Sequence, residues 1–460
     1  MTLRSVLIAN RGEIAVRIIR AAKALGLRTV LAHSIADKES LAAQLADETV
    51  EIGPPAAKKS YLNIEAVVNA AKSAKVDAVH PGYGFLAENA EFAEAVTAAG
   101  IVFVGPSAEA IRLLGDKVMA RQVAALAGVP TVPGSDGRVT DLDAAITIAN
   151  SIGYPVMIKA AAGGGGRGIR IVGDAEEFAR QFPQASSEAA AAFGDGGLYI
   201  EKVIERARHV EVQILGDGHD VVHCYERECS LQRRRQKVWE EAPAVGLPDD
   251  VRQRLCASAV ALGRAVGYSG AGTVEYLYDD ATSAFYFIEV NTRIQVEHPV
   301  TEMITGIDLV QEMLTIAGGA RLSVAQDDIR IQGHAIECRI NAEDPHKGFM
   351  PAPGTIERLV VPDGEGIRFD TLLFEGYAVP PFYDSLLGKL IVRGADRADC
   401  LARLRTALDG LVITGIPTTI PLHAALARDA SVADGRTHTR FLEPWLETDF
   451  AQLARAREDA

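Results

Sequence analysis

The sequence lacks an apolar run of membrane-spanning length, and residues 1–13 contain no long apolar stretch followed by a cleavage site. We therefore expect neither a membrane anchor nor a secretory signal. Cysteine is scarce: five residues, an odd number, lie scattered along the chain, which does not suit a disulfide framework. Cys224 and Cys229 have no second pair to complete a zinc site. These absences favour a cytoplasmic protein.

Positive charge is also in short supply, with 47 Lys and Arg residues against 61 Asp and Glu and a net charge of −14 at pH 7. An acidic surface repels nucleic acid and anionic membranes, because binding either one requires a basic face. We expect neither as a partner, so any phosphate site must be a local basic cluster. A length of 460 residues with 48% apolar content predicts several globular domains.

Strand and helix patterns alternate from residue 5 to about residue 106. The strand VLIA, the polar turn NRGE, a helix with Ile14 and Ile18 at helical spacing, and the strand RTVLAHS form a βαβ unit. The alternation continues to IVFVGP and predicts a doubly wound parallel sheet. In such sheets ligands bind beyond the carboxyl ends of the strands, where NRGE and HPGYGF fall.

The rest of the chain predicts a different architecture. Two helices over about 107–129 lead into a small unit whose first helix precedes a strand, a glycine loop, a strand, a helix ending near residue 182, and a last strand. Antiparallel hairpins follow, one with an Asp217-Gly218 turn and one over 272–298, and the tail from about 333 mixes strands, proline turns and a helix. The expected fold class is multidomain, combining α/β and α+β.

The stretch KAAAGGGGRGIR, residues 159–170, places four consecutive glycines between two β-prone runs. It is not a Walker A loop, because no Gly-Lys-Ser/Thr follows, and it joins two strands, unlike a dinucleotide fingerprint. Without Cβ atoms, successive N–H groups can approach a polyphosphate, and a hairpin lid can open. We favour a phosphate-binding lid with Lys159 at its base, and a flexible linker is the alternative.

The strand pattern FYFIEVNTRIQVEH carries polar residues inside an apolar run. Alternate side chains of a strand share a face, which predicts one face formed by Phe287, Glu289, Asn291 and Arg293. The preceding turn would bring Glu275 opposite them. Carboxylate and amide oxygens suit Mg²⁺, so we predict a metal site; a solvated polar face is the alternative, although it explains charge within FYFI poorly.

Further charged residues surround this strand. Glu297 is a candidate general base, with a structural salt bridge as the alternative. The run from Arg233 to Lys237 indicates an anion site, although a solvated face stays open for Arg233 and Arg234. Cys229 is expected to be a small buried residue rather than a nucleophile.

With these features placed, the chain closely resembles biotin carboxylase, an ATP-grasp enzyme of the biotin-dependent carboxylases. The resemblance covers nearly the whole chain, through IANRGEIAVRIIRA, HPGYGFLAEN, KAAAGGGGRGIR, EVNTRIQVEHPVTEMITG and GHAIECRINAEDP. It implies an N-terminal pre-ATP-grasp α/β domain at 1–115, an ATP-grasp domain at 116–330 with a mobile lid subdomain at about 132–203, and a C-terminal mixed α/β domain at 331–447.

The resemblance also implies the site residues. The residues that would bind ATP are Lys117, Lys159, Gly165, Gly166, Glu201, Lys202, Val203, Ile204, His209, Gln232, Arg235, Glu275 and Glu289. Two Mg²⁺ or Mn²⁺ ions would be held by Glu275, Glu289 and Asn291. Bicarbonate would lie among Lys237, Arg293, Gln295 and Val296, and biotin would contact Arg339 and Tyr83. The catalytic set would be Arg293, Glu297, Lys237 and Arg339, with Glu297 as the base and Arg339 stabilising the biotin enolate.

The implied chemistry is ATP-dependent ligation, in which bicarbonate attacks the γ-phosphate to give carboxyphosphate and biotin is then carboxylated. No Met-Lys-Met acceptor sequence is present, so biotin would be a carried substrate on a biotin carboxyl carrier protein or domain. A carboxyltransferase subunit would complete the reaction on acetyl-CoA, another acyl-CoA, pyruvate or urea, and this sequence does not identify the acceptor. Family members commonly form homodimers, which we expect here.

Two residues near Lys237 depart from the family pattern. Arg235 stands where relatives carry histidine or a less charged residue, and Trp239 replaces a small aliphatic residue, with consequences expected for nucleotide contacts or local packing. Two other functions stay open: a different ATP-grasp ligase joining a carboxylate to an amine, and a nucleotide-binding regulatory subunit with a decayed site. The segment GHAIECRINAEDP argues against the first, and the intact charged set argues against the second.

Overall fold

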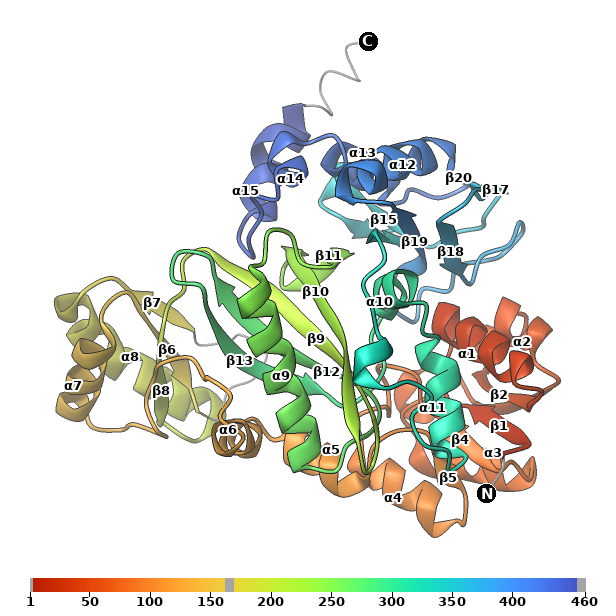
Figure 1. Cartoon of the computed structure of the whole chain (residues 1–460), viewed down its shortest axis with the longest axis horizontal. Helices are drawn as coiled ribbons and strands as arrows, with labels where there is room; N and C mark the ends of the chain where they lie inside the picture. Colours follow the sequence, from red (N-terminus) through yellow and green to blue (C-terminus); the bar gives the residue numbers. More distant parts are fainter. Residues whose placement is uncertain (1–2, 162–168, 453–460) are drawn as a thin grey trace.

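The computed structural model describes residues 3–161 and 169–452, so Gly165 and Gly166 of the predicted lid lie outside the described residues. Its N-terminal region is the predicted parallel sheet, with strand order β3-β2-β1-β4-β5 (Figure 1). The strands are β1 (Ser5–Ile8), β2 (Arg28–Ser34), β3 (Glu48–Gly53), β4 (Ala78–His80) and β5 (Val102–Phe103). The helices are α1 (Gly12–Ala24), α2 (Leu41–Leu45), α3 (Ile64–Ser73) and α4 (Ala90–Ala98). The alternation of strand and helix patterns therefore predicted this parallel sheet, although it did not include α2 or the edge strand β3.

Two helices, α5 (Ala108–Gly115) and α6 (Lys117–Leu126), lead into a small unit that forms its own lobe at the left of Figure 1. This unit has the antiparallel sheet β7-β6-β8 and two helices. Its elements are α7 (Leu142–Ile152), β6 (Val156–Ala160), β7 (Arg170–Val172), α8 (Ala175–Phe193) and β8 (Leu198–Lys202). The predicted end of α8 near residue 182 is wrong, because the helix continues through Pro183 into an alanine-rich segment of high helix propensity.

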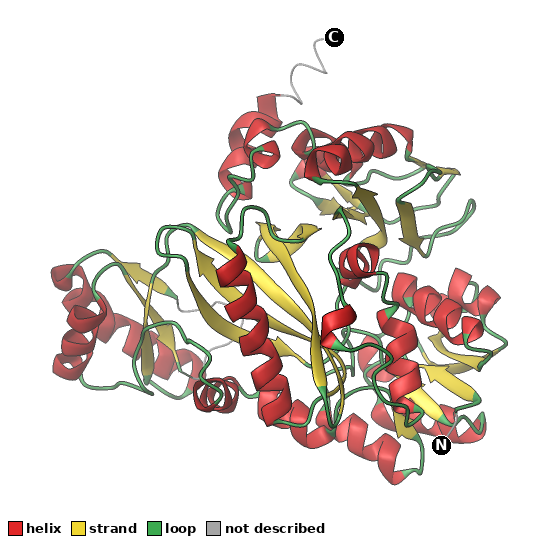
Figure 2. Cartoon of the chain, viewed as in Figure 1, coloured by secondary structure: helices red, strands yellow, loops and turns green. Residues whose placement is uncertain are grey.

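An eight-stranded sheet of order β13-β12-β9-β10-β11-β14-β19-β18 runs from the centre of the molecule into its C-terminal region. The central strands are β9 (Ala207–Asp217), β10 (Val221–Arg233), β11 (Gln236–Ala242), β12 (Ser269–Asp279) and β13 (Ala284–Asn291). The helix α9 (Asp249–Ala265) lies along one face of this sheet (Figure 2). Apolar residues of α9, β9, β12 and β13 form one buried cluster, which leaves the other face of these strands for polar side chains.

The remaining elements extend this sheet and pack around it. Two helices follow β13, namely α10 (His298–Thr305) and α11 (Leu309–Ala317). The C-terminal strands are β14 (His334–Asn341), β15 (Glu343–Asp344), β16 (Met350–Pro351), β17 (Arg358–Val360), β18 (Ile367–Thr371), β19 (Leu386–Gly394) and β20 (Val412–Thr414). The C-terminal helices are α12 (Arg397–Gly410), α13 (Ile420–Leu426), α14 (Ala430–Ala433) and α15 (Leu442–Trp445). Among the described residues, no helix combines the length and the hydropathy that a membrane crossing requires.

Candidate active site

A cavity of about 1060 Å³ is lined by residues from every region of the chain. Most of the site residues implied by the resemblance line it. These are Tyr83, Lys159, Glu201, Lys202, Val203, Ile204, His209, Gln232, Arg235, Lys237, Glu275, Glu289, Asn291, Arg293, Gln295, Val296, Glu297 and Arg339. Lys117 is not one of the residues that line the cavity. Its Nζ lies 3.6 Å from Oε2 of Glu289, which does line it. The fold thus brings together, around one cavity, residues that are separated by more than two hundred positions in the sequence.

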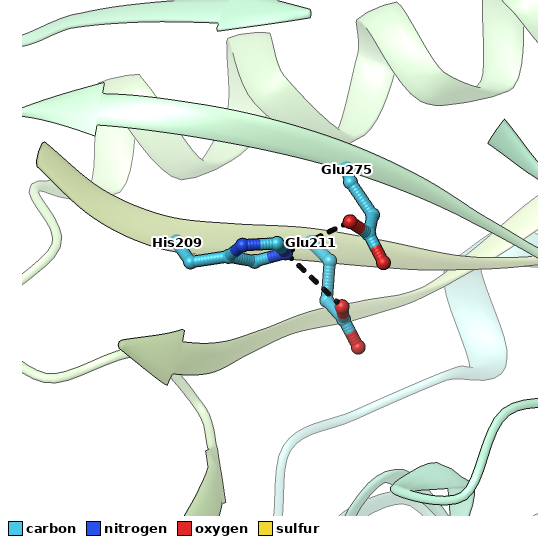
Figure 3. Close-up of side chains that lie close together, drawn as sticks. All are labelled: His209, Glu211 and Glu275. Atoms are coloured by element: carbon cyan, nitrogen blue, oxygen red, sulfur yellow. Dashed lines mark ion pairs between the residues drawn. The ribbon is translucent and has the colours of Figure 1, made fainter. Parts of the chain in front are cut away.

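Strand alternation places the first charged cluster on the face of the sheet opposite α9. Val210 and Val212 of β9 point into the core, so His209 and Glu211 emerge on the other side. Glu211 is the register partner of Glu275 on β12. Nε2 of His209 lies 3.1 Å from Oε2 of Glu275 and 3.6 Å from Oε2 of Glu211 (Figure 3). Burial alone lowers the pKa of His209, but the two carboxylates, Glu275 foremost, raise it to about 9.

Lys237 on β11 joins this cluster to the candidate base. Its Nζ lies 2.5 Å from Glu211, 3.0 Å from Glu275 and 2.6 Å from Glu297. Burial opposes the charge of the ammonium, but these three carboxylates outweigh burial and hold the pKa of Lys237 well above its usual value. The lysine therefore remains a cation at the centre of the site.

Two β-bulges decide which side chains reach the cavity. The register of β12 and β13 shifts between the pairs Glu275–Glu289 and Tyr276–Phe287, which leaves Ile288 as the extra residue. Phe287 consequently packs in the core with Tyr276, while Ile288 lines the cavity beside Glu289. The prediction that Phe287 shares a face with Glu289 is therefore wrong, because a bulge reverses the alternation of side chains.

The second bulge lies between β10 and β11, where Leu231 pairs with Trp239 and Gln232 pairs with Lys237. This shift turns the two β11 side chains to opposite faces. Lys237 lies in the cavity, whereas Trp239 is buried in the C-terminal core with residues of β14 and β19. Of the two residues that depart from the family pattern, Trp239 is thus a packing residue and Arg235 is exposed at the cavity edge.

The residues predicted to hold a metal have a donor set that fits one. Glu275 and Glu289 are directly opposite on neighbouring strands, and Nδ2 of Asn291 donates to Oε1 of Glu275 at 2.9 Å. Both carboxylates and the amide line the same cavity. Burial raises the pKa of Glu275, but Lys237 and His209 outweigh burial and leave that pKa well below its usual value. Ionised carboxylates with an adjacent amide oxygen are suitable ligands for a hard divalent cation.

Glu297 lies between two cations. Its Oε1 accepts a hydrogen bond from Lys237, and its Oε2 accepts one of 3.1 Å from Nη2 of Arg339. Burial raises the pKa of Glu297, yet Lys237 and Arg339 bring it below the usual value, so the side chain is an ionised carboxylate near neutral pH. Nε of Arg339 also donates to Oε1 of the buried Glu240 at 2.6 Å. Both the general base and the salt bridge predicted for Glu297 are compatible with this geometry.

Another cation, Arg293, completes this end of the cavity. Its Nη2 donates to Oδ1 of Asn291 at 2.9 Å and its Nε to Oε2 of Glu88 at 3.0 Å. Gln295 donates to Oε1 of Glu275 at 2.9 Å and accepts from Arg227 at 3.0 Å. These contacts hold the segment between β13 and α10 against the sheet.

The lid side of the cavity carries its own ion pairs. Nζ of Lys159 contacts a carboxylate oxygen of Glu201 on β8, and Arg121 of α6 lies 2.7 Å from the other oxygen. Lys202 points elsewhere, because its Nζ donates to the carbonyls of Gly153 and Tyr154 at the end of α7.

Several residues of the site were not predicted. Glu211 and Arg227 are fully buried, and Nε of Arg227 donates to Oε1 of Glu211 at 2.7 Å. Strand alternation in HVEVQ, applied as it was to EVN, would have placed Glu211 on the same face as His209. Cys229 is buried beside Glu211 and Glu297, and burial holds the pKa of its thiol well above the usual value. The expectation that Cys229 is a small buried residue is therefore confirmed.

Three family models match the chain in succession. They are the biotin carboxylase N-terminal domain over residues 2–111, the ATP-binding domain of the carbamoyl-phosphate synthase L chain over 116–325, and the biotin carboxylase C-terminal domain over 337–444. Among curated proteins, a biotin carboxylase of Pseudomonas aeruginosa is 55% identical over 449 residues, covering 97% of this chain and 99% of the relative. Biotin carboxylase 1 of Bacillus subtilis is 51% identical, covering 96% of this chain and 99% of the relative.

Solved structures show the same similarity. A biotin carboxylase complex with β,γ-ATP from Campylobacter jejuni has a TM-score of 0.89 and 46% identity, covering 96% of this chain and 99% of that chain. The biotin carboxylase domain dimer of the Hydrogenobacter thermophilus 2-oxoglutarate carboxylase, in complex with MgADP, ADP and bicarbonate, has a TM-score of 0.87 and 48% identity. It covers 97% of this chain and 99% of that chain.

Proposed function

Since the chain belongs to the biotin carboxylase family, we propose that its large cavity is the place where ATP and bicarbonate carboxylate biotin. The activity is that of an ATP-dependent ligase that forms a C–N bond. One observation supports this use of the cavity most directly: Lys237 and Arg339 both contact the carboxylate of Glu297 inside it. A base held between two cations is suited to a small anion that must lose a proton.

In the first step the pocket beside Glu297 would hold bicarbonate, with Lys237, Arg293, Gln295 and the backbone of Val296 around it. Glu297 accepts the bicarbonate proton, because its low pKa keeps it ionised, and the cations stabilise the resulting charge. The bicarbonate oxygen then attacks the γ-phosphate of ATP, forming a P–O bond as the bond to ADP breaks. The products of this step are ADP and carboxyphosphate.

Lysines and acidic residues on the two sides of the cavity would hold ATP. Lys117 and Lys159 supply positive charge to its phosphates, and the segment from Glu201 to Ile204 lies along the adenine, with His209 and Gln232 near the ribose. Arg235 adds a cation at the exposed edge. Glu275, Glu289 and Asn291 would hold two Mg²⁺ or Mn²⁺ ions. When bound, these ions offset the negative charge of the phosphoryl oxygens.

The second step takes place at Arg339. Carboxyphosphate breaks to CO₂ and phosphate, the phosphate removes the ureido proton of biotin, and the enolate attacks CO₂ to form the C–N bond. The guanidinium of Arg339 stabilises the enolate oxygen, and Tyr83 borders the same space. Closure of the lid, with Gly165 and Gly166 over the phosphates, would keep water from the intermediate.

We also propose the wider setting of this chain. Biotin arrives on a carrier protein or domain, a carboxyltransferase uses the product, and the chain forms a homodimer, as does the biotin carboxylase domain of the Hydrogenobacter protein. The proposed domain limits are 1–115, 116–330 and 331–447, with the lid at about 132–203, and the order of the three family matches supports the division into three domains. All five cysteines are free thiols, which is typical of a reducing compartment such as the cytoplasm.

Steady-state release of ADP tests the proposal. The purified chain with ATP and Mg²⁺ should release ADP only when bicarbonate is present, and free biotin should stimulate the rate. Glu297→Gln, which keeps the size of the side chain but removes its basicity, should lower that rate by about a hundredfold or more. ADP release that does not depend on bicarbonate would indicate another ATP-grasp ligase, and no turnover at all would indicate a nucleotide-binding regulatory subunit.

A further inference from the structure

A buried lysine lies directly behind the active-site cavity without lining it. The side chain of Lys389 on β19 is fully buried, and its Nζ donates to the carbonyl oxygen of Val296 at 2.8 Å. The same Nζ is 3.2 Å from Oε2 of Glu13 on α1. The other oxygen of Glu13 accepts a hydrogen bond from the hydroxyl of Tyr83. A continuous set of contacts therefore joins Tyr83 to Val296, two residues at separate points of the cavity wall.

This set draws on all three parts of the chain. Glu13 lies within the match to the N-terminal domain, Val296 within the match to the ATP-binding domain, and Lys389 within the match to the C-terminal domain. Lys389 is also the register partner of Arg339, so the two cations are neighbours on adjacent strands. Burying an ammonium and a carboxylate is costly unless they are paired and hydrogen-bonded. A buried ion pair adds little to the stability of the fold, so we infer that this one serves to position the groups that it contacts.

The carbonyl that Lys389 binds belongs to the peptide between Val296 and Glu297. Because a peptide unit is planar, fixing the direction of this carbonyl also fixes the position of the Glu297 Cα atom. Glu297 is the N-cap residue that directly precedes α10, and its carboxylate lies 2.6 Å from Lys237 and 3.1 Å from Arg339. A rotation of this peptide would move the base away from both cations and turn the Val296 backbone that borders the bicarbonate pocket.

We propose that Lys389, held in place by Glu13, is a positioning residue that sets the Val296–Glu297 peptide and thereby the bicarbonate pocket, an inference that rests on the function proposed above. Glu13 also accepts a hydrogen bond from the hydroxyl of Tyr83, so it positions a second residue of the cavity wall. The two residues act through others and need no contact with substrate. Their loss should therefore affect bicarbonate rather than ATP.

Steady-state kinetics of the full chain test this role. Lys389→Met removes the donor to Val296 and should raise the KM for bicarbonate at least tenfold, while the KM for ATP changes less than twofold. This variant leaves Glu13 as an unpaired buried carboxylate and should lower Tm. The double variant Glu13→Gln with Lys389→Met removes both charges, so it should recover much of the lost Tm yet keep the raised KM for bicarbonate.

A matched control separates position from stability. Arg17 lies one helical turn after Glu13 on α1, and its Nη2 is 2.8 Å from Glu302 and 2.6 Å from Asp308, in another buried ion pair between regions of the chain. Arg17→Met should lower Tm without raising the KM for bicarbonate. The inference is overturned if the folded double variant has the wild-type KM for bicarbonate, or if Arg17→Met raises it equally. A wild-type chain without bicarbonate-dependent turnover would instead contradict the proposed function.

Discussion

Arg339 is the residue on which the second half of the proposed reaction depends. Its guanidinium lies in the cavity wall and is held by Glu240 and Glu297, both of which are buried. Burial opposes the ionisation of Arg339, but Glu240 and Glu297 outweigh burial and raise its pKa above the usual value. The guanidinium is thus a fixed positive charge beside the space where the enolate would form.

Arg339→Met should therefore lower the rate of biotin carboxylation by about a hundredfold or more, because the enolate loses its stabilising charge. The Kd for ATP should change less than threefold, since the ATP-binding residues lie on other strands. Isothermal titration and the carboxylation rate check the two effects. The matched control is Arg397→Met, which removes a half-buried arginine that pairs with Glu241 outside the cavity and should leave the rate unchanged. Equal loss of ATP binding and carboxylation would contradict the role of Arg339.

Glu241 gives the stability of the fold a dependence on pH. Burial raises its pKa, but hydrogen bonds from His334 and Arg397 outweigh burial and lower the pKa to about 2. The usual value of about 4.3 applies to the unfolded chain. A carboxyl whose pKa is lower in the folded state stabilises the fold above the unfolded value, and this contribution is lost as pH falls from about 5 toward 2.

Glu241→Gln should accordingly destabilise the protein at about pH 7 by on the order of 3 kcal/mol. The difference in Tm between wild type and variant should narrow as pH is lowered toward about 3, because the Glu241 carboxyl of the unfolded chain then takes up a proton that the folded carboxylate does not. Calorimetry across this pH range provides the measurement. A difference in Tm that stays constant over the range would show that Glu241 is not ionised in the fold.

At the scale of single elements, the sequence predicted most helices and strands but not the register of the strands. Alternation correctly separated Glu289 and Asn291 from Val290, yet it placed Phe287 on the wrong face. The cause is the extra residue Ile288, and a bulge is fixed by packing against the neighbouring strand rather than by local sequence. The same limit hid the opposite orientations of Lys237 and Trp239.

The turn between β10 and β11 offers a test at this scale. Arg234 and Arg235 have φ angles of +48° and +65°, a region that favours glycine, and both side chains are exposed. Arg234→Gly and Arg235→Gly should each raise Tm by about 1–2 °C, because glycine adopts this conformation without strain. Thermal unfolding measures this effect.

The two variants should differ in ATP binding, so each serves as the control for the other. Arg235 lines the cavity and Arg234 does not. Arg235→Gly should raise the KM for ATP severalfold, whereas Arg234→Gly should leave it unchanged. A KM unaffected by either substitution would show that Arg235 makes no contribution to the nucleotide site.

At the scale of the whole molecule, the parallel N-terminal sheet was predicted because its strand and helix patterns alternate, as right-handed βαβ connections require. The eight-stranded sheet was not, since it depends on pairing between distant segments. Its critical pairing joins β11 to β14, in which Trp239 is opposite Cys338. No local pattern near either residue specifies that pairing. Most charged residues of the cavity could still be predicted, because the family motifs identify them without any knowledge of how the strands pair.

The proposed homodimer makes a prediction at the same scale. Sedimentation equilibrium should give twice the 49.0 kDa mass of one chain at micromolar concentration. This mass should not depend on ATP if the contact lies outside the cavity. A single mass of one chain over the whole concentration range would rule out the dimer.

The most direct test of the central claim is the transfer of labelled bicarbonate to free biotin. The purified chain, given ATP, Mg²⁺ and ¹⁴C-bicarbonate, should form acid-labile carboxybiotin, with at least one ADP released for each label transferred. Omitting ATP or introducing Glu297→Gln should abolish the labelled product. ATP hydrolysis that proceeds with bicarbonate and biotin present but leaves biotin unlabelled would contradict the account.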